Sequence, residues 1–490
     1  MSLVPLLIVT ILFLSGVTLP WIRTPLPLTR TSVLLQGAAA CLMAAALPAL
    51  PRTGGVTFTL GASETLWGLH WQYGLTEVLM AAVFSAIAAA IMAASEHLLQ
   101  ELPPARTPLY VMLFHLVHGA ILGILLTGHL FNGFFLLELI GLSSAALIAL
   151  KDKEQNLKAA LKYLLFSTVG SGLVLMGIAC LHGPTGLMTL QRLKEAVPGL
   201  WATDPALVSG SLMCFTAGLG IKGALFPLHL WLPDAHSFAP TPVSALLSAL
   251  VIKAPPFFLL KLTTQVFSPA MPAVGALLSV LTATAAVGVL AASLLARSQT
   301  HLKRMIAYSS VSQIGYVFLG ISLGTGAGAA MALYHMIAHG LAKSLMFLSA
   351  GTLIAQTGSA APEALRGIGK EMPVTLGFFC LSAFSMVGIP VLPGFISKFA
   401  LALAAIEAGR LPVLAVILLS SLLTAAYYFP LIINGFFGED NLRDRISLSK
   451  LRPAREQLPL GALALLLVLA GAFSGTLLEV LEAGMTGGVL

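Results

Sequence analysis

The chain has 490 residues, of which 58% are hydrophobic and only 9% are charged, and its formal net charge is +7. Soluble domains carry roughly 25% charged residues, so this composition excludes a predominantly water-soluble protein. Apolar stretches of the ~20 residues that cross a bilayer recur from end to end and leave no room for a sizeable soluble domain. The sequence therefore predicts one bundle of membrane helices.

Taken in chain order, the apolar stretches predict an all-α polytopic membrane protein with about fourteen transmembrane helices. We expect the spans at 3–20, 31–50, 74–95, 108–127, 130–150, 160–181, 205–226, 241–264, 271–296, 304–322, 326–354, 374–400, 411–434 and 458–479. The first stretch lacks a basic start and a small-residue cleavage site, so we expect a retained helix and not a signal peptide. The longest connections are 51–73, 182–204, 355–373 and 435–457.

The lysines and arginines of alternate connections predict the orientation, because cytoplasmic loops carry an excess of positive charge. One set of connections holds Arg23, Arg30, Arg106, Lys151, Lys153, Lys158, Arg297, Lys303, Arg304, Arg366, Lys370, Arg443, Arg445, Lys450, Arg452 and Arg455. The other set holds Arg52, Arg192, Lys194 and Arg410. This bias predicts an inner-membrane protein with both termini outside, and the scatter of the charges argues against nucleic-acid binding.

Two of the expected spans contain helix breakers beside a lysine. The breakers are Pro227, Pro233, Pro240 and Pro242 within 220–255, and Pro390, Pro393 and Gly394 within 388–398. Non-helical backbone persists at membrane depth only where protein or a watery cavity satisfies it. Interrupted helices in corresponding halves are typical of transporters, so we expect two inverted repeats of about five helices, each with one broken helix.

The expected repeats divide the chain into four segments. Residues 1–107 hold helices one to three, and residues 108–264 hold the first repeat, helices four to eight. Residues 265–434 hold the second repeat, helices nine to thirteen, and residues 435–490 hold a cytoplasmic loop and the last helix.

Several charged residues lie inside the spans, where a charge at the bilayer centre costs at least ~2.5–3.5 kcal/mol. The lysines are Lys162, Lys222, Lys253, Lys261, Lys343 and Lys398. For Lys162 and Lys261, extension to the headgroups explains the sequence as well as a buried role does. Glu138 lies in the middle of FNGFFLLELIGLSS and needs a buried lysine as its partner, whereas Glu77 lies nearer the outer end of its span.

A buried lysine beside a carboxylate is suited to carrying protons. Desolvation lowers the pKa of a buried lysine, and a nearby carboxylate raises it again, so a lysine whose partner can move away is a switchable proton carrier. Lys222 and Lys398 adjoin helix breaks and Lys253 lies inside an apolar run, which favours a buried role for these three lysines. We therefore expect a proton path through them.

His335, His339 and Lys343, in YHMIAHGLAKS, recur every four residues and share one face of a helix. A single buried histidine is more often a core residue, but three aligned titratable groups favour a proton relay. A metal site is a poor match because no acidic residue lies beside them. The cysteines, Cys41, Cys180, Cys214 and Cys380, lack metal-ligand spacing and are expected to be buried apolar side chains.

Together these motifs resemble the antiporter-like subunits of respiratory complex I, membrane-bound hydrogenases and Mrp-type cation/proton antiporters. The matching stretches are FNGFFLLELIGLSS, KAALKYLLFSTVGS, GIKGALFPLHLWLPDAHSFAPTPVSALLSALVIK, HLKRMIAYSSVSQIGY, HMIAHGLAKSLMFLSAG and GIPVLPGFISKF. The resemblance implies a proton pathway through Glu138, Lys222, Lys253, His335, His339, Lys343 and Lys398. It also implies that Glu138 and Lys222 form the switch pair and that Lys398 lies near the exit.

The resemblance implies proton translocation by a subunit of a respiratory oxidoreductase, a hydrogenase or an antiporter, with other membrane subunits as partners. No nucleotide loop, haem motif or cluster ligands occur in the sequence, so we expect no cofactor and any redox site on a partner. PDAHSFAPTPVSALLS favours the hydrogenase-linked or Mrp-type relatives. A non-conducting structural subunit and a stand-alone sodium/proton exchanger stay open as alternatives, the exchanger last because one central acid provides few oxygen ligands for sodium.

Overall fold

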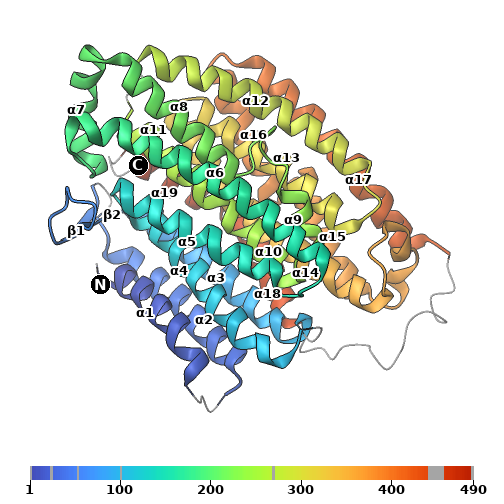
Figure 1. Ribbon diagram of the computed structural model, residues 1–490. Coiled ribbons are helices and arrows are strands. Elements are labelled where there is room, and N and C mark those ends of the chain that lie inside the picture. Colours follow the sequence, from blue (N-terminus) through green and yellow to red (C-terminus); the bar gives the residue numbers. More distant parts are fainter. Residues whose placement is uncertain are drawn as a thin grey trace.

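The computed structural model describes residues 3–22, 26–51, 54–99, 102–267, 271–439 and 457–486. Most of them lie in long helices that run side by side in one bundle (Figure 1). Within this part of the chain, 12 helices are long and apolar enough to cross a membrane, or up to 13 if one bent pair forms a single span. The chain is therefore a polytopic all-α membrane protein, as the composition predicts.

The N-terminal elements, with η for a 3-10 helix, are α1 (Val4–Thr18), η1 (Leu19–Trp21), α2 (Leu28–Ala46), η2 (Leu47–Ala49), β1 (Val56–Leu60), β2 (Leu69–Tyr73), α3 (Leu75–Leu98), η3 (Pro104–Arg106) and α4 (Thr107–Leu126). The central elements are α5 (Leu130–Ala149), α6 (Glu154–Thr185), α7 (Leu190–Thr203), α8 (Pro205–Lys222), α9 (Leu232–Phe238), α10 (Thr241–Ala249), η4 (Val251–Lys253) and α11 (Ala254–Gln265). The C-terminal elements are α12 (Pro272–Arg297), α13 (Leu302–Ser322), α14 (Gly326–Thr357), η5 (Pro362–Leu365), η6 (Ile368–Lys370), α15 (Pro373–Val387), α16 (Pro393–Glu407), α17 (Leu411–Phe437), α18 (Leu458–Ala472) and α19 (Ser474–Thr486).

The helices of the expected spans are present, and both expected breaks are confirmed. α8 ends before the first break, and α15 and α16 are separated by the second. The span expected at 241–264 is also interrupted, since η4 joins α10 to α11, and α18 and α19 meet at 73°. The count of fourteen spans and the two inverted repeats stay predictions.

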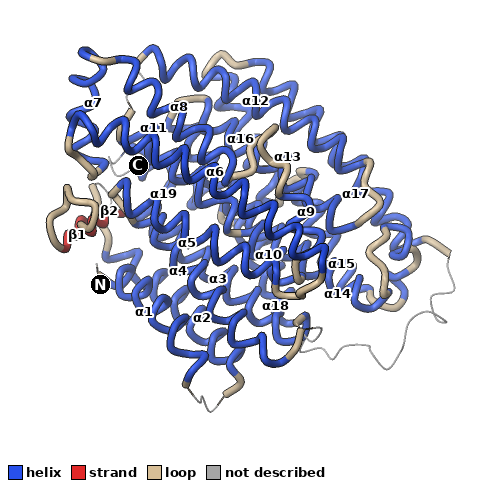
Figure 2. Tube along the Cα trace, viewed as in Figure 1, coloured by secondary structure: helices blue, strands red, loops and turns tan. Residues whose placement is uncertain are grey.

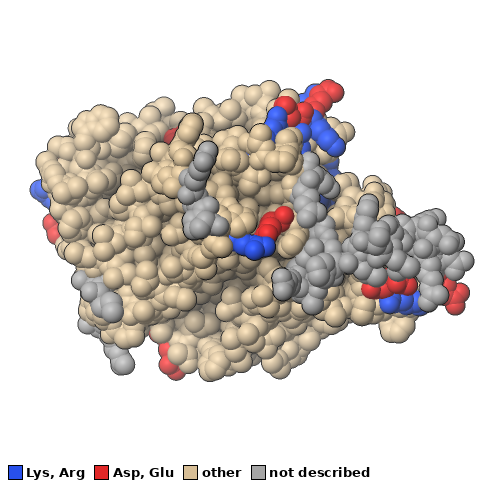
Figure 3. Space-filling view, turned by 90° about the horizontal axis from the view of Figure 1, so that it is seen from below, with Lys and Arg blue, Asp and Glu red and all other residues tan. Residues whose placement is uncertain are grey.

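The interior of the bundle is formed by a few helices that are buried on all sides. The apolar windows of α10–α11, α13 and α14 are 100%, 94% and 89% buried, whereas that of α12 is 33% buried. Many large apolar side chains are exposed, and Figure 3 shows charged side chains only in a few small groups on one face of the molecule. A charge placed on the inner helices is therefore remote from both water and headgroups.

One end of the bundle carries structure that the sequence did not predict. The connection expected at 51–73 contains the antiparallel hairpin β1–β2, in which Val56 pairs with Tyr73 and Leu60 with Leu69. The connection expected at 182–204 contains α7. Figure 2 shows the hairpin beside α7 at the end where α1 begins and α19 ends. The start of α1 and the end of α19 thus lie on the hairpin side, and which side of the membrane this is stays a prediction.

Some of the basic residues that predict the orientation in the membrane lie outside the described part of the chain. They are Arg23, Arg52, Arg443, Arg445, Lys450, Arg452 and Arg455, with most of the connection expected at 435–457. The other basic residues of that prediction are described.

Glu64, in the hairpin loop, fastens the hairpin to α7. Its Oε2 accepts hydrogen bonds from the main-chain N–H of Met188 (2.8 Å) and Thr189 (3.2 Å), and its Oε1 accepts from Thr189 Oγ1 (2.8 Å). Arg192 lies 3.6 Å away. Burial raises the pKa of Glu64, but these hydrogen bonds and the Arg192 charge outweigh it, so the pKa lies below its usual value. The ionised carboxylate therefore fixes the two residues that precede α7, at the end where the helix dipole favours an anion.

We expect Glu64→Gln to destabilise the protein by about 1 kcal/mol at neutral pH, because a neutral amide replaces the charged acceptor of these hydrogen bonds. Because the folded-state pKa is lowered, this stabilisation is present above the unfolded pKa and is lost as the pH falls through the folded pKa. Thermal unfolding in detergent should show a gap between the two proteins that closes below about pH 4. A gap that persists unchanged in acid would contradict this account.

Candidate functional site

The carboxylate and lysine expected in the first repeat form an ion pair. Nζ of Lys222, the last residue of α8, lies 3.2 Å from Oε1 of Glu138 on α5. The same Nζ donates to Oγ of Ser167 on α6 at 2.9 Å. The Lys222 side chain is 5% exposed and that of Glu138 is 28% exposed. The amine is thus fixed inside the bundle, and the carboxylate reaches it from the outer side.

The helix break after Lys222 has identifiable causes. Pro227 cannot donate a backbone hydrogen bond, and Ala224 has a φ of 57°, a left-handed conformation that ends a helix. The carbonyl of Ile221 accepts the N–H of Ala224 at 3.2 Å and also Nε1 of Trp231 at 2.9 Å, so a side chain adds a hydrogen bond at the break.

Glycines bring the helices around the pair into backbone contact. A Cβ on Gly141 would lie 2.6 Å from Oγ of Ser167, and a Cβ on Gly218 would lie 2.6 Å from the main-chain oxygen of Gly170. α6 and α8 therefore approach as small-residue faces do in membrane proteins. The close approach places Ser167 within hydrogen-bond distance of Lys222.

Lys253 lies at the centre of the bundle and is completely buried. It is the last residue of η4, and its Nζ donates to the carbonyl of Ser248 at the end of α10. The hydroxyl of Ser248 meets that of Ser310 on α13 at 2.9 Å. The interruption between α10 and α11 thus supplies the carbonyl that binds the amine.

The face of α14 that carries His335, His339 and Lys343 is buried in the interior of the bundle. The rings of His335 and His339 are stacked, with centroids 6.0 Å apart and planes 5° apart. One turn further on, Nζ of Lys343 donates to the hydroxyl of Ser309 and to the carbonyl of Ile306 at 3.1 Å. Both ring nitrogens of His339 are without a hydrogen-bond partner among the described residues, so this imidazole keeps a donor and an acceptor unused.

The second helix break holds Lys398. Its Nζ donates to the last carbonyls of α15, those of Met386 (2.6 Å) and Val387 (3.2 Å). The Tyr316 ring lies 5.2 Å from the same nitrogen. Ser397, the neighbour of Lys398, hydrogen-bonds Nδ1 of His335 at 2.9 Å, which joins the break to the α14 face.

The expected site residues therefore form two groups. His335 is influenced by the charges of Lys253 and Lys398, and His339 by those of Lys253 and Lys343, so these five residues form one buried cluster. Glu138 and Lys222 form the other group. In the described part of the chain no hydrogen bond joins Lys222 to Lys253, so the structure does not connect the groups directly.

His236 on α9 belongs to the buried cluster and was missed from the sequence. Its side chain is completely buried and stacks on the ring of Phe347, with the centroids 5.0 Å apart. The charges of Lys253, Lys303 and Lys343 act on it. The only sequence signal was its place in PDAHSFAPTPVS, between two helix breakers.

The two lysines that could have extended to the headgroups differ in the structure. Lys162 has a side chain that is 40% exposed and pairs with Asp234 at 2.6 Å, and Asp234 also pairs with Arg304 at 3.1 Å. Lys261 is completely buried and lies 3.7 Å from Glu77, so headgroup extension is wrong for it. Glu77, expected nearer the span end, is 1% exposed and more deeply buried than Glu138.

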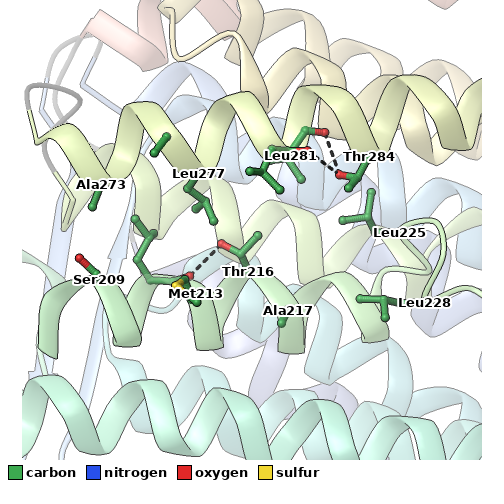
Figure 4. Close-up of a pocket in the computed structure, with 13 residues that line it drawn as sticks. Ser209, Met213, Thr216, Ala217, Leu225, Leu228, Ala273, Leu277, Leu281 and Thr284 are labelled. Atoms are coloured by element: carbon green, nitrogen blue, oxygen red, sulfur yellow. Dashed lines mark hydrogen bonds between the residues drawn. The ribbon is translucent and has the colours of Figure 1, made fainter. Parts of the chain in front are cut away.

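A cavity of about 460 Å³ between α8 and α12 contains none of these charged groups. Figure 4 shows apolar side chains around it, including Met213, Leu277 and Leu281. The hydroxyls of Thr216 and Thr284 bond carbonyls of their own helices, so they present no free polar group. The chemistry of the buried lysines is therefore separate from this surface cavity.

The interrupted helices and the buried lysines and histidines place the chain among helical membrane proteins with a polar interior. Residues 127–424 match the family model described as "NADH:quinone oxidoreductase/Mrp antiporter, TM". The chain belongs to this NADH:quinone oxidoreductase/Mrp antiporter family. It is therefore a multi-span protein of the plasma membrane.

Relatives from two branches match the chain. It is 37% identical to the NADH-quinone oxidoreductase subunit N of Desulforudis audaxviator, over 88% of this chain and 86% of the relative. It is 32% identical to a subunit of the Na(+)/H(+) antiporter of Bacillus subtilis, over 65% of this chain and 64% of the relative.

Two solved structures share the fold. A chain of the membrane-bound sulfane sulfur reductase, an archaeal respiratory membrane complex, gives a TM-score of 0.87 at 27% identity, covering 100% of this chain and 96% of that one. A chain of the Mrp complex from Dietzia sp. DQ12-45-1b gives a TM-score of 0.89 at 22% identity, covering 99% and 97%, which is a likeness of fold alone.

The glycine contact beside Lys222 can be tested by adding one methyl group. We expect Gly218→Ala to lower stability by about 1–3 kcal/mol, because the new Cβ meets the Gly170 oxygen and must push α6 and α8 apart. Gly210→Ala, on the same helix with nothing within 4 Å of the added Cβ, should unfold like the parent protein. Thermal unfolding in detergent compares the two, and equal melting temperatures would contradict the packing account.

Proposed function

We propose that this chain moves protons across the membrane as a subunit of a multisubunit complex of the complex I or Mrp antiporter type. The observation that carries the proposal is the Glu138–Lys222 ion pair, placed where α8 is broken at membrane depth. Family membership and the names of the relatives, which are subunits of an oxidoreductase and of an antiporter, support it.

The ion pair acts as the switch in this proposal. With Glu138 close, Lys222 holds its proton, and when Glu138 moves away the buried amine loses the partner that stabilised its charge. Ser167 keeps the amine in place during the change. The proton then passes towards Lys253 through water, since no direct hydrogen bond joins Lys222 and Lys253 in the described residues.

The buried cluster carries the proton onward. Lys253 and Lys343 exchange the proton through the ring nitrogens of His339 that have no hydrogen-bond partner among the described residues. Ser397 connects His335 to the helix break at Lys398. We place the hairpin side outside, because the connections on that side are poor in lysine and arginine. Other membrane subunits supply the driving reaction, redox chemistry or cation exchange, and protons are the transported ion.

A non-conducting structural subunit is the second candidate. One observation favours it: Lys253 and Lys398 donate to main-chain carbonyls at the ends of α10 and α15, so they stabilise interrupted helices whether or not they carry protons. Transport by variants, measured together with assembly, separates the two candidates.

We expect Glu138→Gln and Lys222→Met to lower proton transport by about tenfold or more, because neither variant can form the charged switch pair. Glu154→Gln, in an exposed pair with Lys158, is the matched control and should transport like the parent. The measurement is proton transport by the intact complex in membrane vesicles, with subunit composition checked in mild detergent. Undiminished transport by both switch variants in an assembled complex would refute the proposal.

A further inference from the structure

A second buried lysine–glutamate pair lies outside the pathway proposed above. Lys261 on α11 and Glu77 on α3 are 3.7 Å apart, and their side chains are 0% and 1% exposed. Removing two charges from water costs several kcal/mol per ion unless both groups are well satisfied. The hydrogen-bond partners of the two groups therefore show whether the pair is a fully satisfied structural contact or has polar atoms left over for proton transfer.

The amine of the pair is well satisfied. Nζ of Lys261 donates to the carbonyls of Leu125 (2.6 Å), Thr127 (3.1 Å) and Gln72 (3.4 Å). The first two are free carbonyls at the end of α4, where the helix dipole favours a cation. The lysine thus has acceptors of its own and does not depend on the carboxylate.

The carboxylate of the pair is only half satisfied. Oε2 of Glu77 accepts the N–H of Gly74 at 2.8 Å, but Oε1 has no hydrogen-bond partner among the described residues and faces the Lys261 ammonium 3.7 Å away. In the same part of the chain, Oε1 of Gln72 and Nε2 of His70 are also buried without a hydrogen-bond partner. Buried polar atoms of this kind are normally bonded by ordered water, so the three atoms mark a place for water beneath the hairpin, here called the passage.

The passage continues to the surface through the hairpin loop. The charge of Glu64 acts on both His70 and His129, and Arg192 beside Glu64 has a side chain that is 59% exposed. Burial lowers the pKa of His70 more than Glu64 raises it, so its imidazole is neutral near pH 7. A neutral imidazole both donates and accepts, which is what a proton relay requires.

The other end of the passage points to the buried cluster. Lys253, Phe257 and Lys261 recur every four residues and lie on one face of the α11 segment, about 12 Å from end to end. Phe257 stands between the two lysines in this row, and its ring centroid is 5.6 Å from Nζ of Lys261.

We propose that Glu77 and Lys261 form a proton-transfer site that connects Lys253 with the hairpin surface at Glu64. The inference rests on the proton translocation proposed above. In the transfer, an N–H bond of the Lys261 ammonium breaks and an O–H bond forms at Oε1 of Glu77, leaving a neutral amine and a neutral acid. The acid passes its proton to water beneath the hairpin, and Lys261 takes the next proton from the side of Lys253.

Lys261→Arg distinguishes this site from a purely structural pair. Arginine keeps the positive charge and the donors for the carbonyls but does not release its proton, because its pKa exceeds about 12. A structural cation survives this exchange, whereas a proton carrier does not. Glu77→Gln is the second variant, since its amide oxygen still accepts the N–H of Gly74 while the charge is gone.

The experiment measures proton transport by the intact complex in membrane vesicles, and assembly in mild detergent. We expect both variants to assemble and to lose transport by about tenfold or more, and Lys158→Arg, in an exposed pair, to match the parent. Full transport by either assembled variant, with Glu138→Gln inactive, would overturn this inference and leave the proposed function intact. Full transport by Glu138→Gln as well would overturn the function itself. Failure of both variants to assemble would assign the pair a structural role and likewise overturn the inference.

Discussion

The structure depends on the need to satisfy backbone carbonyls where helices end inside the membrane. A helix leaves its last carbonyls without partners, and no lipid group can bond them. Buried lysines perform this task repeatedly. The pairs of amine and carbonyl are Lys398 with Met386 and Val387, Lys253 with Ser248, Lys303 with Ala239, and Lys261 with Leu125 and Thr127. Interrupted helices and buried lysines thus explain each other, since each would be costly alone.

This arrangement has a consequence for the central cluster. No carboxylate lies within ion-pair distance of Lys253, Lys343 or Lys398 among the described residues, so main-chain dipoles and hydroxyls hold these amines in place of acids. Like charges repel strongly where the dielectric constant is low. A cluster of this kind favours a single mobile charge over several fixed ones. The acids are kept at its margins, with Glu138 beside Lys222 and Glu77 beside Lys261.

The sequence predicts the features that repeat along one helix, and misses those made by distant segments. The apolar stretches, the breaks at Lys222 and Lys398 and the shared face of His335 and His339 follow from local periodicity and from proline. The hairpin was missed because its strands are short and lie outside the spans. Lys261 was left undecided because its partners come from residues more than 130 positions away along the chain. His236 has no periodic companion on its seven-residue helix, so no pattern identified it.

The two lysine–glutamate pairs differ in what lies outside them. Glu77 is covered by the hairpin and is 1% exposed, so its surroundings belong to this chain. Glu138 lies midway along α5, and its side chain is 28% exposed between Phe135 and Leu142, which are themselves 60% and 55% exposed. A carboxylate facing lipid at this depth is costly, so this face of α5 is more stable when another protein surface covers it. The exposure of Glu138 therefore supports a subunit over a chain that works alone, and it places the proposed switch pair where a neighbouring subunit can contact it.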